Sequence, residues 1–168
     1  ITRMVAITAV GGMWLAPGQV EPLRAAVMLL TTCMVVAGAN ALNCYLERDS
    51  DRLMQRTARR PLPDGRMEPR LALAFGLVLG LVSVPVLTLA INPLTGLLGA
   101  VALISYVAIY TPMKQYTPTA LLVGAVPGAL PPLMGWTAVT NGLEAPGLVL
   151  FSILFLWQVP HFIAISIF

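Results

Sequence analysis

Charged residues are scarce in this chain of 168 residues. They make up 10% of it, against about 25% in an ordinary soluble domain. Hydrophobic residues make up 58%, and the mean hydropathy is +0.84. This composition excludes an ordinary soluble domain, and we expect lipid to surround most of the protein's surface.

Cysteine is also scarce, since Cys33 and Cys44 are the only two and both lie in one apolar stretch. A disulfide framework needs more cysteines in a loop-rich, secreted chain, so we interpret these two as small buried thiols. The net charge of +3 and the pI near 9.2 would suit nucleic acid. The basic residues nevertheless stand beside apolar segments, where they set membrane topology, and we predict no nucleic-acid partner.

Long apolar segments dominate what is present. A helix that spans a bilayer needs about 20 predominantly apolar residues. Six segments meet or approach this length: Ile1 to Ala16, Pro22 to Tyr45, Leu71 to Ile91, Thr95 to Tyr110, Ala120 to Val139, and Gly147 to Phe168. Turn signals separate several of them, at Pro17-Gly18, Asn92-Pro93, Thr117-Pro118 and Asn141-Gly142. The pattern predicts an all-α, polytopic transmembrane helical bundle in a single domain.

The basic residues predict how this bundle sits in the membrane. When alternate crossings are counted, all of the 10 lysines and arginines except Arg24 fall on one side. Those nine are Arg3, Arg48, Arg52, Arg56, Arg59, Arg60, Arg66, Arg70 and Lys114. By the positive-inside rule this side is the cytoplasm, or the matrix in a mitochondrion. We expect an integral protein of the bacterial inner (plasma) membrane, or of the mitochondrial inner membrane.

The fifth segment contains Pro127, Pro131 and Pro132. Proline removes a hydrogen-bond donor and clashes with the preceding turn, which predicts that this segment is not a regular helix. Carbonyls freed at membrane depth must be buried in protein or line a cavity. Two interpretations stay open: a kinked packing helix, and a broken helix that borders a substrate chamber.

Polar residues at the end of the second segment form the clearest constellation. Asn43, Glu47 and Asp51 are spaced four residues apart, which places them on nearly one face of an α-helix, about 6 Å apart along its axis. Asn40 adds an amide one turn deeper. Polar groups at membrane depth usually face a cavity, and Mg²⁺ binds oxygen ligands together with substrate phosphates. We therefore predict a magnesium site for a phosphorylated substrate.

Basic residues follow this acidic stripe. Arg52, Arg56, Arg59 and Arg60 come directly after it, and Lys114 lies on the same side of the membrane. Guanidinium groups match phosphate oxygens in pairs, so this order of charges would hold a diphosphate leaving group and neutralise its charge. The alternative is structural: the arginines fix topology, the acids pair with them, and Lys114 is a basic anchor.

His161 is the only histidine. It stands one helical turn after Gln158 in an apolar segment, and the two side chains would face the same chamber. A histidine with a purely structural role is the other interpretation, and the residues leave the choice open.

Taken together, these motifs resemble the UbiA-type intramembrane prenyltransferases. Asn43-x3-Glu47-x3-Asp51 is similar to the first acidic motif of that family, with Glu at the middle position. The run from Arg56 to Pro63 resembles the arginine–proline signature of one branch, the protohaem IX farnesyltransferases. Four further stretches resemble this branch, in order along the chain: Asn92 to Gly96, Tyr110 to Lys114, Val123 to Thr137, and Trp157 to Phe162.

The resemblance implies a fold of nine spans around a chamber, with farnesyl diphosphate bound through Mg²⁺. The farnesyl group would pass to a vinyl group of haem b and give haem o. The resemblance carries metal–diphosphate ligation, directly or through water, over to the catalytic residues Asn43, Glu47 and Asp51. It carries diphosphate binding over to Arg56, Arg60 and Lys114, and a haem contact to His161. Haem–copper oxidase assembly factors are candidate partners.

The resemblance also implies a second acidic motif after the sixth span. Residues 1–168 would then be about six of the nine spans of one prenyltransferase domain, without its C-terminal spans, and we expect them to be inactive alone. Three alternatives stay open: a UbiA-type enzyme with an aromatic or quinone-precursor acceptor, a membrane transporter, and a non-enzymatic oxidase assembly protein. A transporter would be expected to carry paired repeats with ionisable groups deep in the bilayer, whereas these carboxylates gather at one mouth.

Overall fold

Every regular element in the described part of the chain is a helix. The computed structural model describes residues 2–167, with side chains up to residue 164. In order, the elements are α1 (Thr2–Leu15), α2 (Pro22–Asp51), α3 (Pro69–Val86), η1 (Leu87–Ile91), α4 (Pro93–Ile104), η2 (Ser105–Tyr110), α5 (Thr111–Met113), α6 (Ala120–Thr140) and α7 (Ala145–Ile167), where η marks a short π-helix. The predicted all-α class is confirmed. Ile1 and Phe168, the outer ends of the first and sixth predicted segments, lie outside the described residues.

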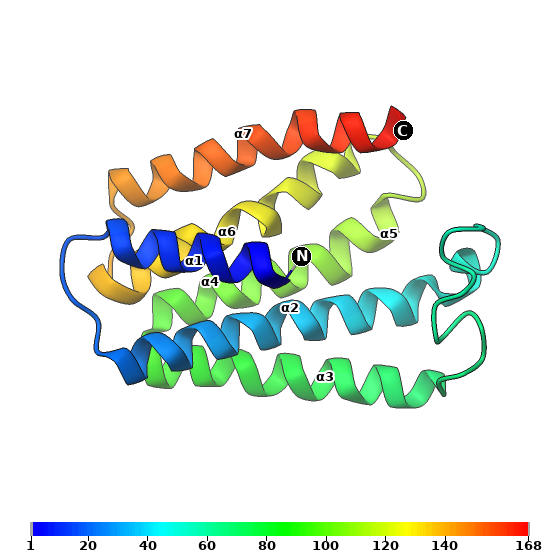
Figure 1. The fold of residues 1–168 in the computed structure, drawn as a ribbon, viewed down its shortest axis with the longest axis horizontal. Helices are drawn as coiled ribbons and strands as arrows, with labels where there is room; N and C mark the ends of the chain where they lie inside the picture. The colour runs from blue at the N-terminus through cyan, green and yellow to red at the C-terminus, as the bar shows by residue number, and fades with distance from the viewer. Residues whose placement is uncertain (1, 168) are drawn as a thin grey trace.

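The helices lie side by side along the long axis of the molecule (Figure 1). α3 continues through η1 as one rod, and α4 continues through η2 and α5 as another. α6 packs against α1, α4 and α7, whereas α2 packs mainly against α3. The end of α2 and the end of the α4–η2–α5 rod therefore stand at the same end of the bundle, where the loop from α2 to α3 also lies (Figure 1).

Five helical stretches are long and apolar enough to cross a bilayer: Pro22–Asp51, Pro69–Ile91, Pro93–Met113, Ala120–Thr140 and Ala145–Ala164. The first predicted segment forms only the 14-residue helix α1, which is shorter than the roughly 20 residues that a span needs. The other five predicted spans are confirmed as membrane-crossing candidates.

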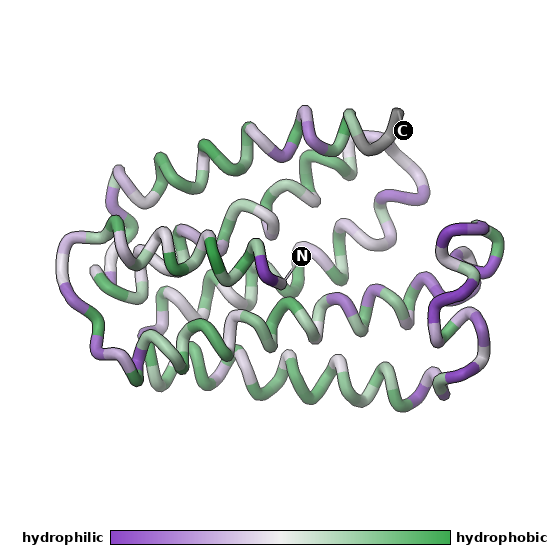
Figure 2. Tube along the Cα trace, in the orientation of Figure 1, coloured by the Kyte–Doolittle hydropathy of each residue, from purple (hydrophilic) through white to green (hydrophobic). Residues whose placement is uncertain are grey.

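The outer surface of these helices is apolar. Large side chains point away from the bundle, among them Leu81 (72% exposed) and Leu89 (85% exposed). Figure 2 shows hydrophobic residues along the helices and hydrophilic residues in the loop between α2 and α3. Apolar area in water is unfavourable by about 25 cal/mol per Å², and lipid removes that cost. The chain is an integral membrane protein.

Two of the predicted turns stand between helices, as expected, and an asparagine caps a helix at each. Asn92 caps α4: its Oδ1 accepts from the Thr95 backbone N–H at 2.7 Å, and its Nδ2 donates to the Thr137 carbonyl at 2.8 Å. The second bond ties this turn to α6. Asn141 ends α6 in the left-handed region, with φ of 57°, a conformation that asparagine adopts more readily than most residues. Both turns lie at the end of the bundle opposite the α2–α3 loop (Figure 1).

The structure corrects the prediction that the fifth segment is irregular. α6 runs without interruption from Ala120 to Thr140, through Pro127, Pro131 and Pro132. It tolerates these prolines because other helices enclose it: 67% of its span is buried, the largest share among the five candidate spans. Enclosure of this kind is what a proline-containing helix needs at membrane depth, where freed carbonyls are tolerated only against protein or a cavity. The packing interpretation fits this environment.

Close contact with α1 explains part of this burial. Gly12 of α1 lies against the backbone of Pro132, and Gly135 of α6 lies against the backbone of Ala9. A methyl group at either glycine would collide with a carbonyl oxygen of the other helix. Small residues that let two backbones approach are typical of helix packing in membranes.

Candidate active site

Helix α2 carries the predicted stripe out to its last turn. The helix ends at Asp51, well past the predicted end at Tyr45, so Asn43, Glu47 and Asp51 all lie on it as expected. Their exposed fractions are 7%, 7% and 6%. Buried carboxylates need partners for their charge, and two other segments of the chain supply them.

Both carboxylate oxygens of Glu47 are engaged. Oε1 lies 2.6 Å from Nζ of Lys114, and Oε2 accepts from Nδ2 of Asn43 at 3.0 Å. Lys114 is the C-cap of α5, so this ion pair joins α2 to the α4–η2–α5 rod. The structure thus brings together three residues that the sequence assigned to one site.

Asp51 is paired with the loop that follows α2. Its Oδ2 accepts from a guanidinium nitrogen of Arg60 at 2.8 Å. The hydroxyl of Thr57, which is buried, donates to the Asp51 backbone carbonyl at 2.9 Å. This bond turns the loop back toward the end of the helix and brings Arg60 beside the carboxylate. The Arg60 side chain is 41% exposed, so this pair borders the solvent.

Thr111 is a buried member of the cluster that the sequence analysis missed. Its hydroxyl oxygen lies 2.9 Å from Oδ1 of Asn43 and 2.8 Å from the carbonyl oxygen of Tyr106. Thr111 stands three residues before Lys114, and residues three apart share a helix face. That spacing is the signal that could have found it, since Lys114 was expected in the site.

Two predicted site residues lie apart from this cluster. The Arg56 side chain is exposed and forms no ion pair among the side chains that the structure describes. His161 stacks on Trp157 of its own helix, with ring centroids 4.7 Å apart. Gln158, which was expected to share a chamber with His161, instead packs on Gly128 of α6. Gln158 therefore contacts α6, whereas His161 stacks on a residue of its own helix.

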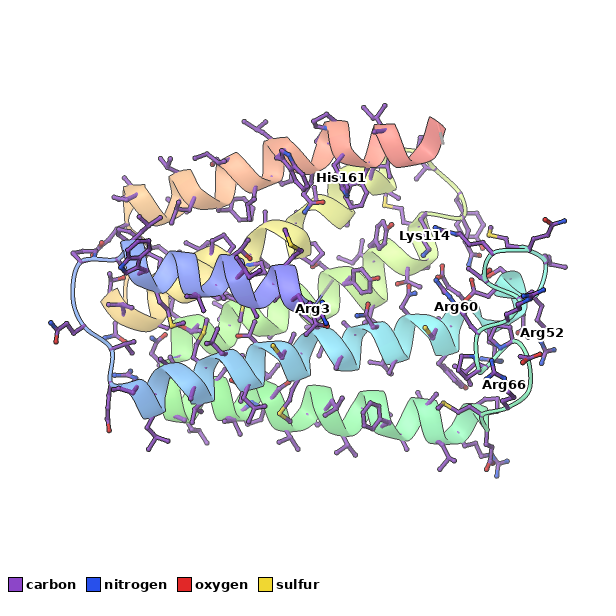
Figure 3. All side chains as sticks on the ribbon, in the orientation of Figure 1. Arg3, Arg52, Arg60, Arg66, Lys114 and His161 are labelled. Carbon is purple, nitrogen blue, oxygen red and sulfur yellow. The ribbon has the colours of Figure 1, made fainter. Side chains whose placement is uncertain are left out.

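The basic residues of the loop and of α5 gather at one end of the molecule. Figure 3 shows Arg52, Arg60, Arg66 and Lys114 at that end, with His161 away from it on α7. Arg3, which the topology prediction grouped with them, lies part-way along the bundle in the same view. The loop arginines and Lys114 thus form the positive end of the bundle.

The donor set fits one kind of metal site. Within the described residues, no group of three or more His, Cys, Asp or Glu side chains could hold a metal ion. Mg²⁺ usually keeps several waters and is bound through one or two carboxylates plus substrate phosphates. Glu47 and Asp51, one turn apart on α2, fit a Mg²⁺ ion that binds with a diphosphate. They do not fit a cage made of these protein ligands alone.

The ionised side chains of the cluster balance one another in charge. The carboxylates of Glu47 and Asp51 face the cations of Lys114 and Arg60. A metal–diphosphate complex offers each group a new partner: the metal ion would join the carboxylates, and the phosphate oxygens would join the lysine and the arginine. Burial strengthens such charge interactions. The arrangement therefore suits an anionic diphosphate that binds with a divalent cation.

Known proteins share this sequence pattern. The model of the UbiA prenyltransferase family matches residues 5–168. The chain belongs to the UbiA prenyltransferase family. This UbiA chain is 58% identical to the protoheme IX farnesyltransferase of Anaeromyxobacter dehalogenans and 60% identical to that of Myxococcus xanthus, each over 168 residues. Both alignments cover 100% of the chain and 57% of the relative, so the chain spans little more than half the length of these curated relatives.

A solved structure has the same fold as this UbiA family member. The apo structure of a UbiA homolog from Aeropyrum pernix K1 matches it with a TM-score of 0.79 and 23% sequence identity, over 94% of this chain and 59% of that one. The predicted UbiA-like fold is confirmed. Family membership favours a prenyltransferase over the transporter and the assembly protein among the alternatives from the sequence.

Proposed function

We propose that the protein to which these residues belong transfers a farnesyl group from farnesyl diphosphate to a vinyl group of haem b, forming haem o. One observation carries the proposal: the two buried carboxylates expected to bind metal are paired with Lys114 and Arg60, which are expected to bind diphosphate. The identity to two protoheme IX farnesyltransferases supports haem as the acceptor.

The acidic stripe is the metal side of the proposed site. Glu47 and Asp51 offer carboxylate oxygens, with Asn43 beside Glu47, and ligation is direct or through water. A bound Mg²⁺ ion would neutralise charge on the departing diphosphate. The allylic C–O bond breaks and its electron pair leaves with the diphosphate. The π electrons of a haem vinyl group then form the new C–C bond and leave a positive carbon next to it. Water adds to that carbon and loses a proton to solvent, which completes the hydroxyethylfarnesyl group.

The basic residues are the phosphate side. Lys114 and Arg60 exchange their carboxylate partners for phosphate oxygens when the diphosphate binds. Arg56, exposed at the same mouth and without an ion pair among the described side chains, adds a third cation. We propose for His161 a contact with haem, because its exposed ring stacks on that of Trp157, which is also exposed, and offers a flat surface.

The positive end of the bundle faces the cytoplasm, or the mitochondrial matrix, in this proposal. Seven of the ten basic residues lie between Arg48 and Arg70, across the end of α2, the loop and the start of α3, and Lys114 lies at the same end; basic loops stay on that side. The membrane is then the bacterial inner membrane or its mitochondrial counterpart. Haem–copper oxidase assembly factors are the further partners that this function suggests.

Residues 1–168 supply one of the two acidic motifs of the complete enzyme in this proposal. The family resemblance and the 57% coverage of the curated relatives support this division. The isolated chain is then expected to lack turnover with farnesyl diphosphate and haem b, whereas the complete protein is active. Haem o formed by the isolated chain would contradict this part of the proposal.

The test is farnesyl transfer by the complete protein in lipid nanodiscs, with farnesyl diphosphate, haem b and Mg²⁺. Glu47→Gln and Asp51→Asn each remove a charge and keep the side-chain shape, so we expect the rate to fall about 100-fold or more. Asp49→Asn is the matched control, because this neighbouring carboxylate is 71% exposed and, among the side chains that the structure describes, pairs only with Arg48.

Two outcomes would overturn the proposal. Wild-type rates for both Glu47→Gln and Asp51→Asn, at normal expression, would remove the carboxylates from the mechanism. A panel of acceptors tests the other half: farnesylation of an aromatic acid or quinone precursor, with no product from haem b, would replace haem as the acceptor while leaving the metal–diphosphate site in place.

A further inference from the structure

We propose that Thr111 is a positioning residue that holds Glu47 in the metal–diphosphate site through Asn43. The inference rests on the proposed function and deepens it. Thr111 begins α5, directly after the π-helical segment η2, and it is 1% exposed. π-Helical segments of this kind are frequent at functional sites. The hydroxyl of Thr111 reaches across to α2, where Asn43 is its partner.

The carboxylate of Glu47 fixes the orientation of the Asn43 amide. An ionised carboxylate can only accept hydrogen bonds, so the amide atom 3.0 Å from it must be the donor Nδ2. The amide oxygen Oδ1 then faces Thr111, at 2.9 Å from its hydroxyl oxygen. Because Oδ1 can only accept, the Thr111 hydroxyl must donate to it.

The hydroxyl of Thr111 has one proton and two acceptors within hydrogen-bond distance. The other acceptor within reach is the Tyr106 carbonyl, at 2.8 Å. That carbonyl already accepts the backbone N–H of Thr111, in the i to i+5 pattern of η2. The proton can therefore go to Asn43 without leaving the Tyr106 carbonyl unsatisfied. The result is a chain of bonds with one direction, from Thr111 to Asn43 and from Asn43 to Glu47.

This series of hydrogen bonds assigns Asn43 a different role from the one that its sequence position suggested. The amide oxygen expected to bind a metal ion is the acceptor of the Thr111 hydroxyl, and the amide nitrogen holds Oε2 of Glu47. When Lys114 leaves Glu47 to bind a phosphate oxygen, the hydrogen bond from Asn43 keeps the Glu47 carboxylate oriented. Groups that orient a metal ligand typically change metal affinity or activity by about 10- to 100-fold when they are lost.

Substitution of Thr111 separates this role from mere packing. Thr111→Val keeps the shape but removes the donor, leaving Oδ1 of Asn43 buried without a partner. Thr111→Ser keeps the donor and loses a methyl group. Thr31→Val is the matched control, because Thr31 is a buried residue of α2 whose hydroxyl bonds to backbone carbonyls of its own helix, at Val27 and Met28.

The measurement uses the complete protein in nanodiscs and two readouts. The first is the dissociation constant of Mn²⁺, which replaces Mg²⁺ because electron paramagnetic resonance detects it. It is measured with inorganic diphosphate present and without turnover. The second is the Mg²⁺ concentration that gives half-maximal farnesyl transfer. For Thr111→Val we expect both values to rise about 10-fold or more. Thr111→Ser and Thr31→Val should stay close to wild type.

The outcomes distinguish this inference from the proposed function. Wild-type Mn²⁺ binding by Thr111→Val, with binding lost in Glu47→Gln, would overturn the role of Thr111 and leave the metal site standing. Unchanged binding in Glu47→Gln as well would overturn the site itself. If Thr111→Val cannot be recovered folded, Thr111→Cys replaces it, because a thiol is a weaker donor. Its Mn²⁺ affinity must then fall, and an unchanged affinity would refute the inference.

Discussion

The Nζ atom of Lys114 lies 2.6 Å from Oε1 of Glu47 and, on another side, 5.3 Å from the centre of the Tyr110 ring. The same ring packs on α6 at Gly124, where an added methyl group would come within 2.6 Å of it. Lys114 therefore contacts both α2 and an aromatic ring that packs on α6, and its ammonium group joins the two.

Removal of the Lys114 charge should affect both stability and binding. Lys114→Met leaves the Glu47 carboxylate buried without its cation. We expect a loss of about 1–3 kcal/mol of stability, less than for a fully enclosed pair because Lys114 is 30% exposed. We also expect the KM for farnesyl diphosphate to rise about 10-fold. Thermal unfolding and initial-rate kinetics measure the two effects. Lys114→Arg retains the charge, and a loss of stability in that variant equal to the loss in Lys114→Met would contradict the ion-pair explanation.

Arg60 and Arg56 allow a direct comparison within one loop. Arg60 pairs with Asp51, whereas Arg56 is exposed and unpaired among the described side chains. Arg60→Gln should lower the melting temperature and raise the KM for farnesyl diphosphate. Arg56→Gln should leave the melting temperature unchanged and raise only the KM, because Arg56 meets its partner when the diphosphate binds. Equal melting temperatures for the two variants would show that the Arg60–Asp51 pair does not stabilise the loop.

Local patterns predicted the helices and the acidic stripe. The length of an apolar segment determines whether it can span a bilayer, and the spacing of Asn43, Glu47 and Asp51 determines that they share a helix face. Neither property depends on which helix lies beside which. For this reason the sequence placed the carboxylates correctly on one face and anticipated that Lys114 lies on the same side.

Features that depend on helix packing were beyond the sequence. The contact of Thr111 with Asn43 exists because the α4–η2–α5 rod meets α2 at that height. The spacing of Thr111 and Lys114 places the two on one helix face, but it does not identify Asn43 as the partner. The continuity of α6 through Pro127, Pro131 and Pro132 depends on the helices that enclose it. The stacking of His161 on Trp157 is local, because the two residues are four apart on α7. Which face of α7 packs on α6 and which is exposed could be learned only from the structure.

Two neighbouring glycines of α1 test the packing against α6. A methyl group at Gly12 would collide with the carbonyl oxygen of Pro132, while one at Gly11 would meet nothing within 4 Å. Gly12→Ala should destabilise the protein by about 1–3 kcal/mol through overpacking. Gly11→Ala should be neutral, or stabilising by up to about 1 kcal/mol because alanine favours the helix. Thermal unfolding of the two purified variants decides, and equal melting temperatures would contradict the close contact.

Substitution of His161 should change the KM for haem b and leave the KM for farnesyl diphosphate unchanged. His161→Phe keeps an aromatic ring on Trp157 and removes the imidazole nitrogens. Because His161 lies away from Lys114 and Arg60 (Figure 3), we expect unchanged dependence of the rate on Mg²⁺ and on farnesyl diphosphate. The KM for haem b should rise if the imidazole touches haem. A change confined to the farnesyl diphosphate KM would place His161 at the other substrate.

The side of the membrane that holds the positive end can be tested with single cysteines. Cys33 and Cys44 are first replaced by alanine, and Leu53→Cys or Glu144→Cys is then introduced. Leu53 is 87% exposed in the α2–α3 loop, and Glu144 is exposed in the connection between α6 and α7 at the opposite end.

A thiol reagent that cannot cross the membrane is applied to intact cells of a bacterial host and to inverted membrane vesicles. Because basic loops are retained on the cytoplasmic side, the cysteine at position 53 should react only in inverted vesicles and the one at 144 only in intact cells. The reverse labelling would place the metal–diphosphate mouth outside the cytoplasm, where the proposed orientation would be untenable.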